Sequence, residues 1–324
     1  MGELAGEPVT FDLVREKNEV YPEYGYFRGF YRYDRFGGPI ALYGSIDSSG
    51  FLVLTEQGGY EQEPHTLRGE WSPTGYQGRW FSGNGRDDHP FDLVAVDTGY
   101  VPLQYQETMD KLVAFPAWTY SPEASFRAQW LIPRSADSAT NHFIERAIAA
   151  ELANADMATN STTIEQAVES AKNSFFSDYR REMLSLHKEG VLDSTTHDNF
   201  MPYNYTYEKS TLVYYNSTDL LTLGFTDYSY MGGAHGIYAT EVHAYDLKAR
   251  KKISLDEVLL PGYENALSDA LARALRVKYQ LGKDTPLSEL LFEDKLEPNE
   301  NFGLTDKGIF FVYQPYEIAA YAVG

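Results

Sequence analysis

The segment Gly-Gly-Ala-His-Gly at residues 232–236 brings together residue types that catalysis can use and residue types that a turn requires. His235 titrates near neutral pH, so its imidazole can act as a general base or bind a metal ion. Asp227, before it in the chain, or Glu241, after it, would then be the carboxylate partner. One hypothesis is therefore a hydrolase that uses His235 with Asp227 or Glu241.

The alternative is that the same segment is a turn between two strands. Gly232 and Gly233 would supply positive φ, with Gly236 completing the motif, while His235 hydrogen-bonds the nearby backbone. His243 lies roughly 26 Å further along an extended strand, at about 3.3 Å per residue, so the two histidines cannot share one metal ion. The segment also lacks the Lys-Ser/Thr pair of a phosphate-binding loop. We favour the turn, and we expect no catalytic residue, no metal ion and no cofactor.

Two groups of residues are candidates for a binding surface. Asp227, close to Tyr230, either joins His235 in a polar cluster or belongs to a hydrogen-bonded network at a sheet edge. The segment 313–317 concentrates aromatic residues beside a proline, which either cap a core or form a patch that binds protein or sugar. The candidate binding residues are Asp227, Tyr230, His235, Tyr313, Tyr316 and Glu317.

The region that precedes these motifs, residues 1–105, reads as a β-rich domain. Short alternating runs separated by Asp-Ser-Ser-Gly and Ser-Pro-Thr-Gly predict two hairpins, over 39–56 and 67–80. Trp71 and Trp80 are either a glycan-stacking platform or part of a core, and we favour the core. A repeated spacing suggests stacked hairpins, because Leu42, Gly44, Ile46 and Gly50 recur 25 residues later as Leu67, Gly69, Trp71 and Gly75.

The rest of the chain mixes strands with well-separated helices. Apolar spacing predicts helices within 135–155, over 162–190 and over 262–282. Thr162 or Thr163 can cap the second helix, and Gly190 suits its end. Strands are predicted over 125–134, in a hairpin over 210–230, after residue 235, and over 307–319 as far as Pro315 permits.

These elements predict an α+β fold with a largely antiparallel sheet and helices on one face, preceded by the β-rich N-terminal domain. The length of 324 residues fits about two domains of roughly 100–200 residues each. We divide the chain into residues 1–105, 106–209 and 210–324, with a boundary near 100–110 that no Pro- or Ser-rich linker marks.

Composition limits the classes of partner. Lys and Arg number 27 against 47 Asp and Glu, a formal net charge of −20, which opposes binding to nucleic acid and to an anionic membrane surface. The same charge attracts a basic partner or simply keeps the protein soluble. The chain has no cysteine, which excludes disulfides and thiolate metal sites. The first residues have neither the basic region nor the apolar core of a signal peptide, so the protein is either cytoplasmic or begins after a removed export signal.

The C-terminal part resembles the family known as domain of unknown function 3298 over about residues 210–324. Its members run Gly-Gly-Ala-His-Gly, Asp-Leu, a Ser/Thr-Leu-x-Asp/Glu helix start, and a Tyr-Glu-Ile-Ala-x-Tyr-Ala-x-Gly segment. The upstream region, 106–209, resembles the partner domain of unknown function 4163. The matching positions here are Gly232 to Gly236; Asp246 and Leu247; Ser254, Leu255 and Asp256; and Tyr316, Glu317, Ile318, Ala319, Tyr321 and Gly324.

This resemblance implies a role outside the cytoplasm. The family includes envelope lipoproteins, the outer part of a lysozyme-sensing anti-sigma factor and an appendage of a peptidoglycan deacetylase. It therefore implies a periplasmic or surface-exposed binding or sensing module, held at the membrane only by a lipid anchor. A basic protein such as lysozyme, or a cell-wall glycan, is the expected ligand, and a cell-wall-active hydrolase is the alternative.

Overall fold

The computed structural model describes residues 1–17, 25–57, 63–157, 162–194 and 200–323. Gly324, one of the positions that carry the family resemblance, lies outside the described residues. The chain forms two compact units. The first unit comprises residues 1–101, 213–224 and 241–324, and the second comprises residues 102–212 and 225–240.

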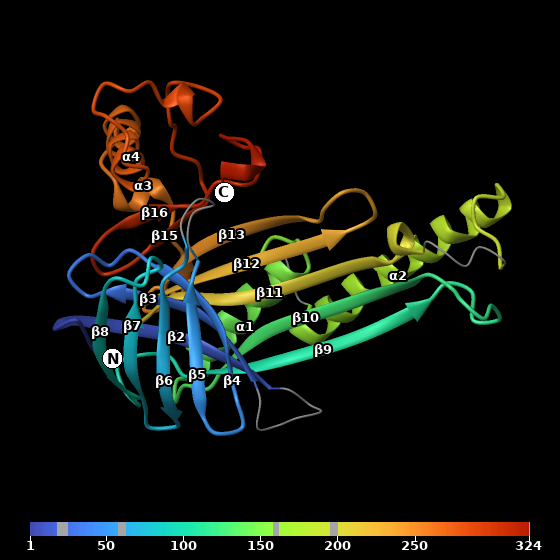
Figure 1. Cartoon of the computed structure of the whole chain (residues 1–324), viewed down its shortest axis with the longest axis horizontal. Helices are drawn as coiled ribbons and strands as arrows, with labels where there is room; N and C mark the ends of the chain where they lie inside the picture. The colour runs from blue at the N-terminus through green and yellow to red at the C-terminus, as the bar shows by residue number, and fades with distance from the viewer. Residues whose placement is uncertain (18–24, 58–62, 158–161, 195–199, 324) are drawn as a thin grey trace. The chain divides into compact units, whose positions relative to one another are not determined.

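The N-terminal part of the first unit is a closed antiparallel β-barrel (Figure 1). Each strand pairs with the next along the chain, and the first closes on the last, with Gly2 opposite Leu93. Full closure leaves no unpaired edge strand. Its strands are β1 (Gly2–Leu4), β2 (Glu7–Lys17), β3 (Gly25–Tyr33), β4 (Ile40–Ile46), β5 (Phe51–Glu56), β6 (Thr66–Ser72), β7 (Gly75–Phe81) and β8 (Asp88–Val94).

Side chains fill the inside of this barrel. Leu52 and Leu54, two residues apart on β5, are both fully buried, as the alternation of a strand requires. Trp71 packs edge-on against Phe27, with ring centroids 5.3 Å apart. The indole of Trp80 donates to a Glu56 carboxylate oxygen at 2.6 Å. Both tryptophans pack against the barrel core, as the core interpretation predicted.

The repeated spacing in the sequence places a buried leucine and a close-approach glycine at matching positions of two strands. Leu42 on β4 and Leu67 on β6 both point into the core. A Cβ at Gly44 would lie 1.8 Å from the Val53 carbonyl oxygen, and one at Gly69 would lie 2.0 Å from that of Gln77. Glycine therefore allows the close approach of neighbouring strands where the barrel curves.

A six-stranded sheet has the order β14-β13-β12-β11-β10-β9. Strands β10 and β11 run parallel, with Ala124 opposite Tyr205. A parallel pair needs a long crossover, which two helices supply here. The strands are β9 (Leu103–Val113), β10 (Glu123–Pro133), β11 (Tyr205–Asn216), β12 (Leu220–Tyr230), β13 (Ile237–Asp246) and β14 (Lys251–Lys252).

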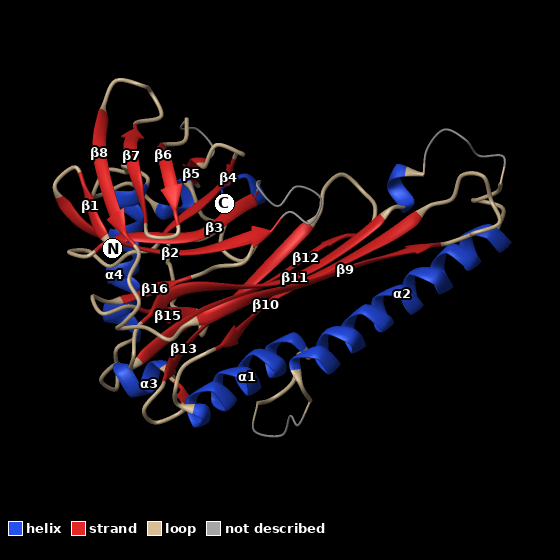
Figure 2. Ribbon diagram, turned by 90° about the horizontal axis from the view of Figure 1, so that it is seen from below, coloured by secondary structure: helices blue, strands red, loops and turns tan. Residues whose placement is uncertain are grey.

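The two crossover helices, α1 (Ser138–Leu152) and α2 (Ile164–Lys188), lie along one face of this sheet and contact β10 (Figure 2). Asp137 caps α1 by accepting from the Ala139 amide at 2.9 Å. A capping box between Thr163 and Gln166 begins α2, and Gly190 follows its end with φ +76°. The predicted α+β fold with helices on one face is confirmed.

The remaining elements belong to the first unit. They are α3 (Leu255–Val258), α4 (Glu264–Lys278), β15 (Phe302–Leu304) and β16 (Ile309–Phe311). The predicted strand over 307–319 is wrong beyond Phe311, because the chain turns there: the Glu317 amide donates to the Gln314 carbonyl at 3.0 Å, and Tyr316 has φ +67°. None of the helices in the described ranges combines the length and the apolar composition of a membrane span.

Candidate functional site

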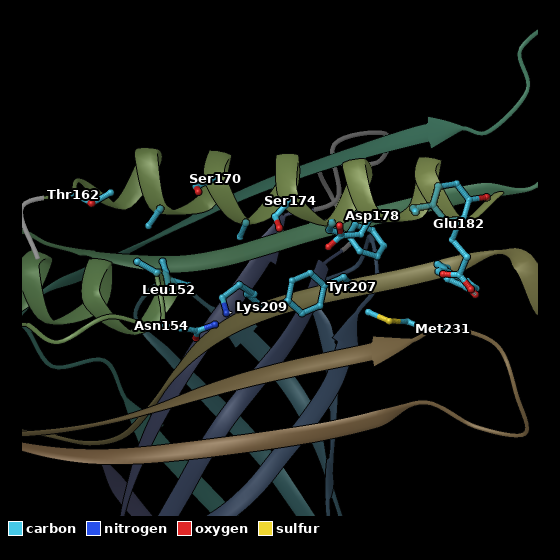
Figure 3. A pocket seen from close by; sticks show the side chains of 16 residues that line it. Leu152, Asn154, Thr162, Ser170, Ser174, Asp178, Glu182, Tyr207, Lys209 and Met231 are labelled. Atoms are coloured by element: carbon cyan, nitrogen blue, oxygen red, sulfur yellow. Dashed lines mark hydrogen bonds between the residues drawn. The ribbon is translucent and has the colours of Figure 1, made fainter. Parts of the chain in front are cut away.

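A solvent-open groove of about 490 Å³ lies in the second unit, between α2 and β11 (Figure 3). One end of the groove is lined by Leu152 and Asn154, where α1 ends. Met231 also lines the groove. This volume falls in the range of small-molecule sites, roughly 300–1,000 Å³. The groove is therefore the candidate binding site of this unit.

The α2 wall of the groove is a stripe of polar residues. Ser170, Ser174, Asp178 and Glu182 recur every four residues, so they lie on one side of the helix. All four are exposed to solvent. The buried side of the same helix packs on the sheet, where Phe175 lies 5.6 Å from the Tyr207 ring. The helix is thus held by its apolar side and presents hydroxyls and carboxylates to the groove.

The β11 side of the groove is built from alternate residues of one strand. Tyr205, Tyr207 and Lys209 share one face because side chains alternate along a strand. Lys209 is only 2% exposed, and within the described ranges few other charged side chains are buried. A buried ammonium requires a partner that is itself charged or strongly polar.

Asp227 on β12 provides that partner. Its Oδ2 accepts from Lys209 Nζ at 2.7 Å and from the Tyr207 hydroxyl at 3.0 Å. Lys209 Nζ also lies 3.3 Å from the Tyr207 hydroxyl. Burial, and then the Asp227 charge, raise the pKa of Tyr207, so the phenol stays neutral and donates. The three side chains form a polar cluster, of which Tyr207 and Lys209 line the groove.

The other end of the β11 face carries a second polar contact. The Tyr205 hydroxyl donates to Glu182 Oε1 at 2.8 Å. Burial, and then the bond to Glu182, raise the pKa of Tyr205, so this phenol also stays neutral. Asp178, one turn before Glu182, forms an ion pair with Arg181 on the same helix. The ring of Tyr179 packs against Tyr205 beneath these groups, with centroids 5.3 Å apart.

The structure places Asp227 in the lysine–tyrosine cluster. The segment 232–236, Gly-Gly-Ala-His-Gly, forms an exposed turn between β12 and β13. His235 is exposed, with its Nδ1 2.8 Å from the Gly236 carbonyl oxygen. The Tyr230 hydroxyl donates to the Gly233 carbonyl at 3.1 Å. Glu241, the other proposed partner of His235, lies 3.5 Å from His243 Nε2.

The glycines of this turn have distinct surroundings. Gly232 and Gly233 have φ +85° and φ +92°. A Cβ at Gly232 would lie 2.7 Å from the Pro202 carbonyl oxygen, whereas a Cβ at Gly233 would meet nothing within 4 Å. A Cβ at Gly236 would lie 2.4 Å from the Tyr228 hydroxyl oxygen. These glycines therefore serve backbone conformation and close packing.

We expect Gly232→Ala to lower the free energy of unfolding by about 2 kcal/mol, because it adds a backbone clash to the cost of positive φ. Gly233→Ala carries only the conformational cost, about 1 kcal/mol, and serves as the matched control. His235→Ala, at an exposed position, should cost less than about 0.5 kcal/mol. Urea denaturation of the three variants measures this order. A His235→Ala effect above that of Gly232→Ala would contradict it.

The residues of the 313–317 segment lie in the first unit. Tyr313 is half-buried and packs beside a small core around Leu287, and its hydroxyl donates to the Glu297 carbonyl at 2.6 Å. Burial, and then the Glu317 charge, raise the pKa of Tyr313 to about 12. Tyr316 is exposed and lies 5.7 Å from the Tyr321 ring. Glu317 Oε2 accepts from the Gln314 amide at 2.6 Å.

Sequence reasoning missed most of the groove. Of its residues and their partners it singled out only Asp227. Two signals were present in the sequence. Polar residues recur every four residues on α2, and Lys209 lies on the same inward face of β11 as Val213 and Tyr215. An inward lysine predicts a buried ion pair, but only the fold shows that its partner is on the next strand.

Comparison with known proteins assigns the C-terminal part of the chain. Residues 256–324 match the sequence model of the family described as protein of unknown function DUF3298. This segment is a DUF3298 domain. The match confirms the resemblance over a shorter stretch than 210–324. No curated protein sequence matches the chain.

The region upstream of the DUF3298 domain matches a second family model, described as deacetylase PdaC, over residues 134–238. This stretch contains every residue that lines the groove. The resemblance of residues 106–209 to domain of unknown function 4163 stays a prediction.

Two solved structures of DUF3298 proteins resemble the chain. The crystal structure of a family member from Bacteroides fragilis is 23% identical, covers 70% of this chain and 89% of its own, and superposes with a TM-score of 0.59. A family protein from Pseudomonas aeruginosa is 17% identical, covers 68% of this chain and 87% of its own, and has a TM-score of 0.43. The first of these likenesses shows a shared fold.

Proposed function

We propose that this chain is a non-catalytic binding module of the bacterial cell envelope and that the groove between α2 and β11 holds its ligand. The observation that carries the proposal is the groove itself: it is open to solvent and about 490 Å³ in volume. Its lining combines apolar surface with a few convergent polar groups, the usual composition of a ligand site.

The ligand is a cell-wall saccharide chain. Hydroxyl groups of a sugar pair with Ser170, Ser174 and the carboxylates of α2, while its C–H faces suit the apolar lining from Leu152 to Phe175. A protein ligand such as lysozyme buries roughly 800 Å² on each partner, so it would also have to contact surface outside the groove. The net charge of −20 favours encounters with basic proteins but provides no specific site for one.

Binding without catalysis fits the chemistry of the groove. Asp227 Oδ2 accepts from both Lys209 and Tyr207, so the ammonium and the phenol are already paired within the cluster. No histidine is among the described residues that line the groove, and the chain has no cysteine.

A second candidate function, a cell-wall-active hydrolase, is favoured by one observation. The family model that covers the groove is described as deacetylase PdaC. Such an enzyme would use His235 with Asp227 or Glu241. Release of acetate from an N-acetylated oligosaccharide by the purified protein, and its loss in His235→Ala, would establish this candidate over binding alone.

The module works outside the cytoplasm, in the periplasm or on the cell surface, as a lipoprotein. The DUF3298 domain and the resemblance to exported envelope proteins support this location. Fractionation of cells that produce the natural protein, with palmitate labelling, tests it. Recovery in the cytoplasmic fraction would overturn it.

The binding proposal is tested by calorimetric titration with N-acetylglucosamine oligomers, soluble muropeptides and lysozyme, at low and moderate salt. We expect saturable saccharide binding that Ser174→Trp, which fills the groove, weakens at least about tenfold. Asn173→Trp is the matched control, because Asn173 is exposed, lies about 100° around the helix from Ser174 and does not line the groove, so it should change affinity less than about twofold. Binding of lysozyme alone, or no binding of saccharide, would overturn the proposal.

A further inference from the structure

The charges along the groove are unevenly distributed. Lys209 lies at the end near Leu152 and Asn154, whereas Glu182 lies at the far end of the α2 wall (Figure 3). The Lys209 charge is already compensated by Asp227, 2.7 Å away. The ammonium is therefore not available to balance the carboxylates at the opposite end.

The carboxylates at that end are incompletely compensated. The neutral Tyr205 hydroxyl donates to Glu182 Oε1, and the Glu182 side chain is exposed to solvent. Asp178 pairs with Arg181, but the two side chains are 65% and 73% exposed. An ion pair that open to water is weak and easily exchanged for another cation. This end of the groove is thus a site of net negative charge beside a neutral donor.

From this asymmetry we infer that the groove selects a saccharide that carries free amines, a de-N-acetylated glucosamine chain, with an ammonium group between Asp178 and Glu182. An ammonium donates charge-assisted hydrogen bonds to carboxylates, which are roughly twice as strong as neutral ones. An N-acetylated sugar offers a neutral amide at the same place, and that amide cannot compensate the charge. The sugar hydroxyls then lie toward Ser170 and Ser174. The inference rests on the proposed function, since it assumes that the groove holds a saccharide.

The test compares glucosamine and N-acetylglucosamine oligomers of equal length by calorimetric titration at moderate salt. We expect the amine-bearing oligomer to bind about threefold to fivefold more tightly, the preference that an exposed ion pair supports. Glu182→Gln keeps an acceptor for Tyr205 and removes the charge, so it should abolish most of that preference, and Asp178→Asn should reduce it. Glu165→Gln, an exposed position of α2 outside the groove, removes the same charge and is the matched control.

The outcomes separate the two claims. Equal or tighter binding of the acetylated oligomer would overturn the inference while leaving the groove a saccharide site. An equal loss of preference in Glu165→Gln would also overturn it, because the net charge of the protein would then be the cause. Binding of neither oligomer would overturn the proposed function itself.

Discussion

Asp227→Ala will lower the free energy of unfolding by about 2 to 3 kcal/mol. The change leaves the Lys209 ammonium, 2% exposed, without its carboxylate at 2.7 Å. Removing one partner of a buried ion pair costs more than the pair contributes, because the remaining charge has lost its solvation. The Asp227 side chain is 38% exposed and the Tyr207 hydroxyl remains nearby, so the expected loss is smaller than the roughly 3–5 kcal/mol usual for a fully buried pair.

The double variant Lys209→Met/Asp227→Ala is the control. An apolar side chain of similar length needs no partner, so this variant should lie within about 1 kcal/mol of the natural protein. Equilibrium urea denaturation of both single variants and the double variant measures the coupling. If Asp227→Ala and the double variant are equally destabilised, the ion pair does not account for the loss. In that case packing at β12 is responsible.

Leu54→Ala will lower the stability of the barrel by about 3 kcal/mol. Its side chain is fully buried in the barrel core, among residues of the same cluster on β4 and β6. Truncation removes three heavy atoms from a closed barrel whose strands cannot collapse inward, so a cavity remains. The loss should appear as a lower urea midpoint with an unchanged slope.

Val53→Ala is the matched control for this truncation. Val53 precedes Leu54 on β5, is only partly buried, and lies on the opposite face of the strand. It should cost less than about 1 kcal/mol, mainly through the lower strand preference of alanine. Equal losses for the two variants would show that the interior of the barrel is not the close-packed core that the burial pattern describes.

In the second unit, the groove between α2 and β11 is open to a ligand. Its walls are rigid for identifiable reasons. The capping box at Thr163 fixes the start of α2, and aromatic contacts such as Phe175 with Tyr207 hold the helix on the sheet. A site built on a helix and a strand keeps its geometry better than one built on loops.

The sequence by itself determined the local elements of this protein. The hairpins around residues 47–50 and 72–75, the helix start at Thr163 and the helix end at Gly190 all follow from turn and cap chemistry, which acts over a few residues. The paired glycines, Gly44 and Gly69, were visible as a repeat. The sequence did not show that these glycines allow close approach to a neighbouring strand, because the carbonyl oxygens that they approach belong to other segments.

Only the tertiary structure decided where chemistry-bearing residues meet. The residue type of His235 suggested a general base or a metal ligand, but His235 lies on an exposed turn. The sequence did not single out Lys209 or Glu182, although both line the groove. Barrel closure and the parallel pairing of β10 with β11 depend on contacts between distant segments. Such contacts leave no local periodicity in the sequence, so burial, ion pairing and the groove could be found only in the folded chain.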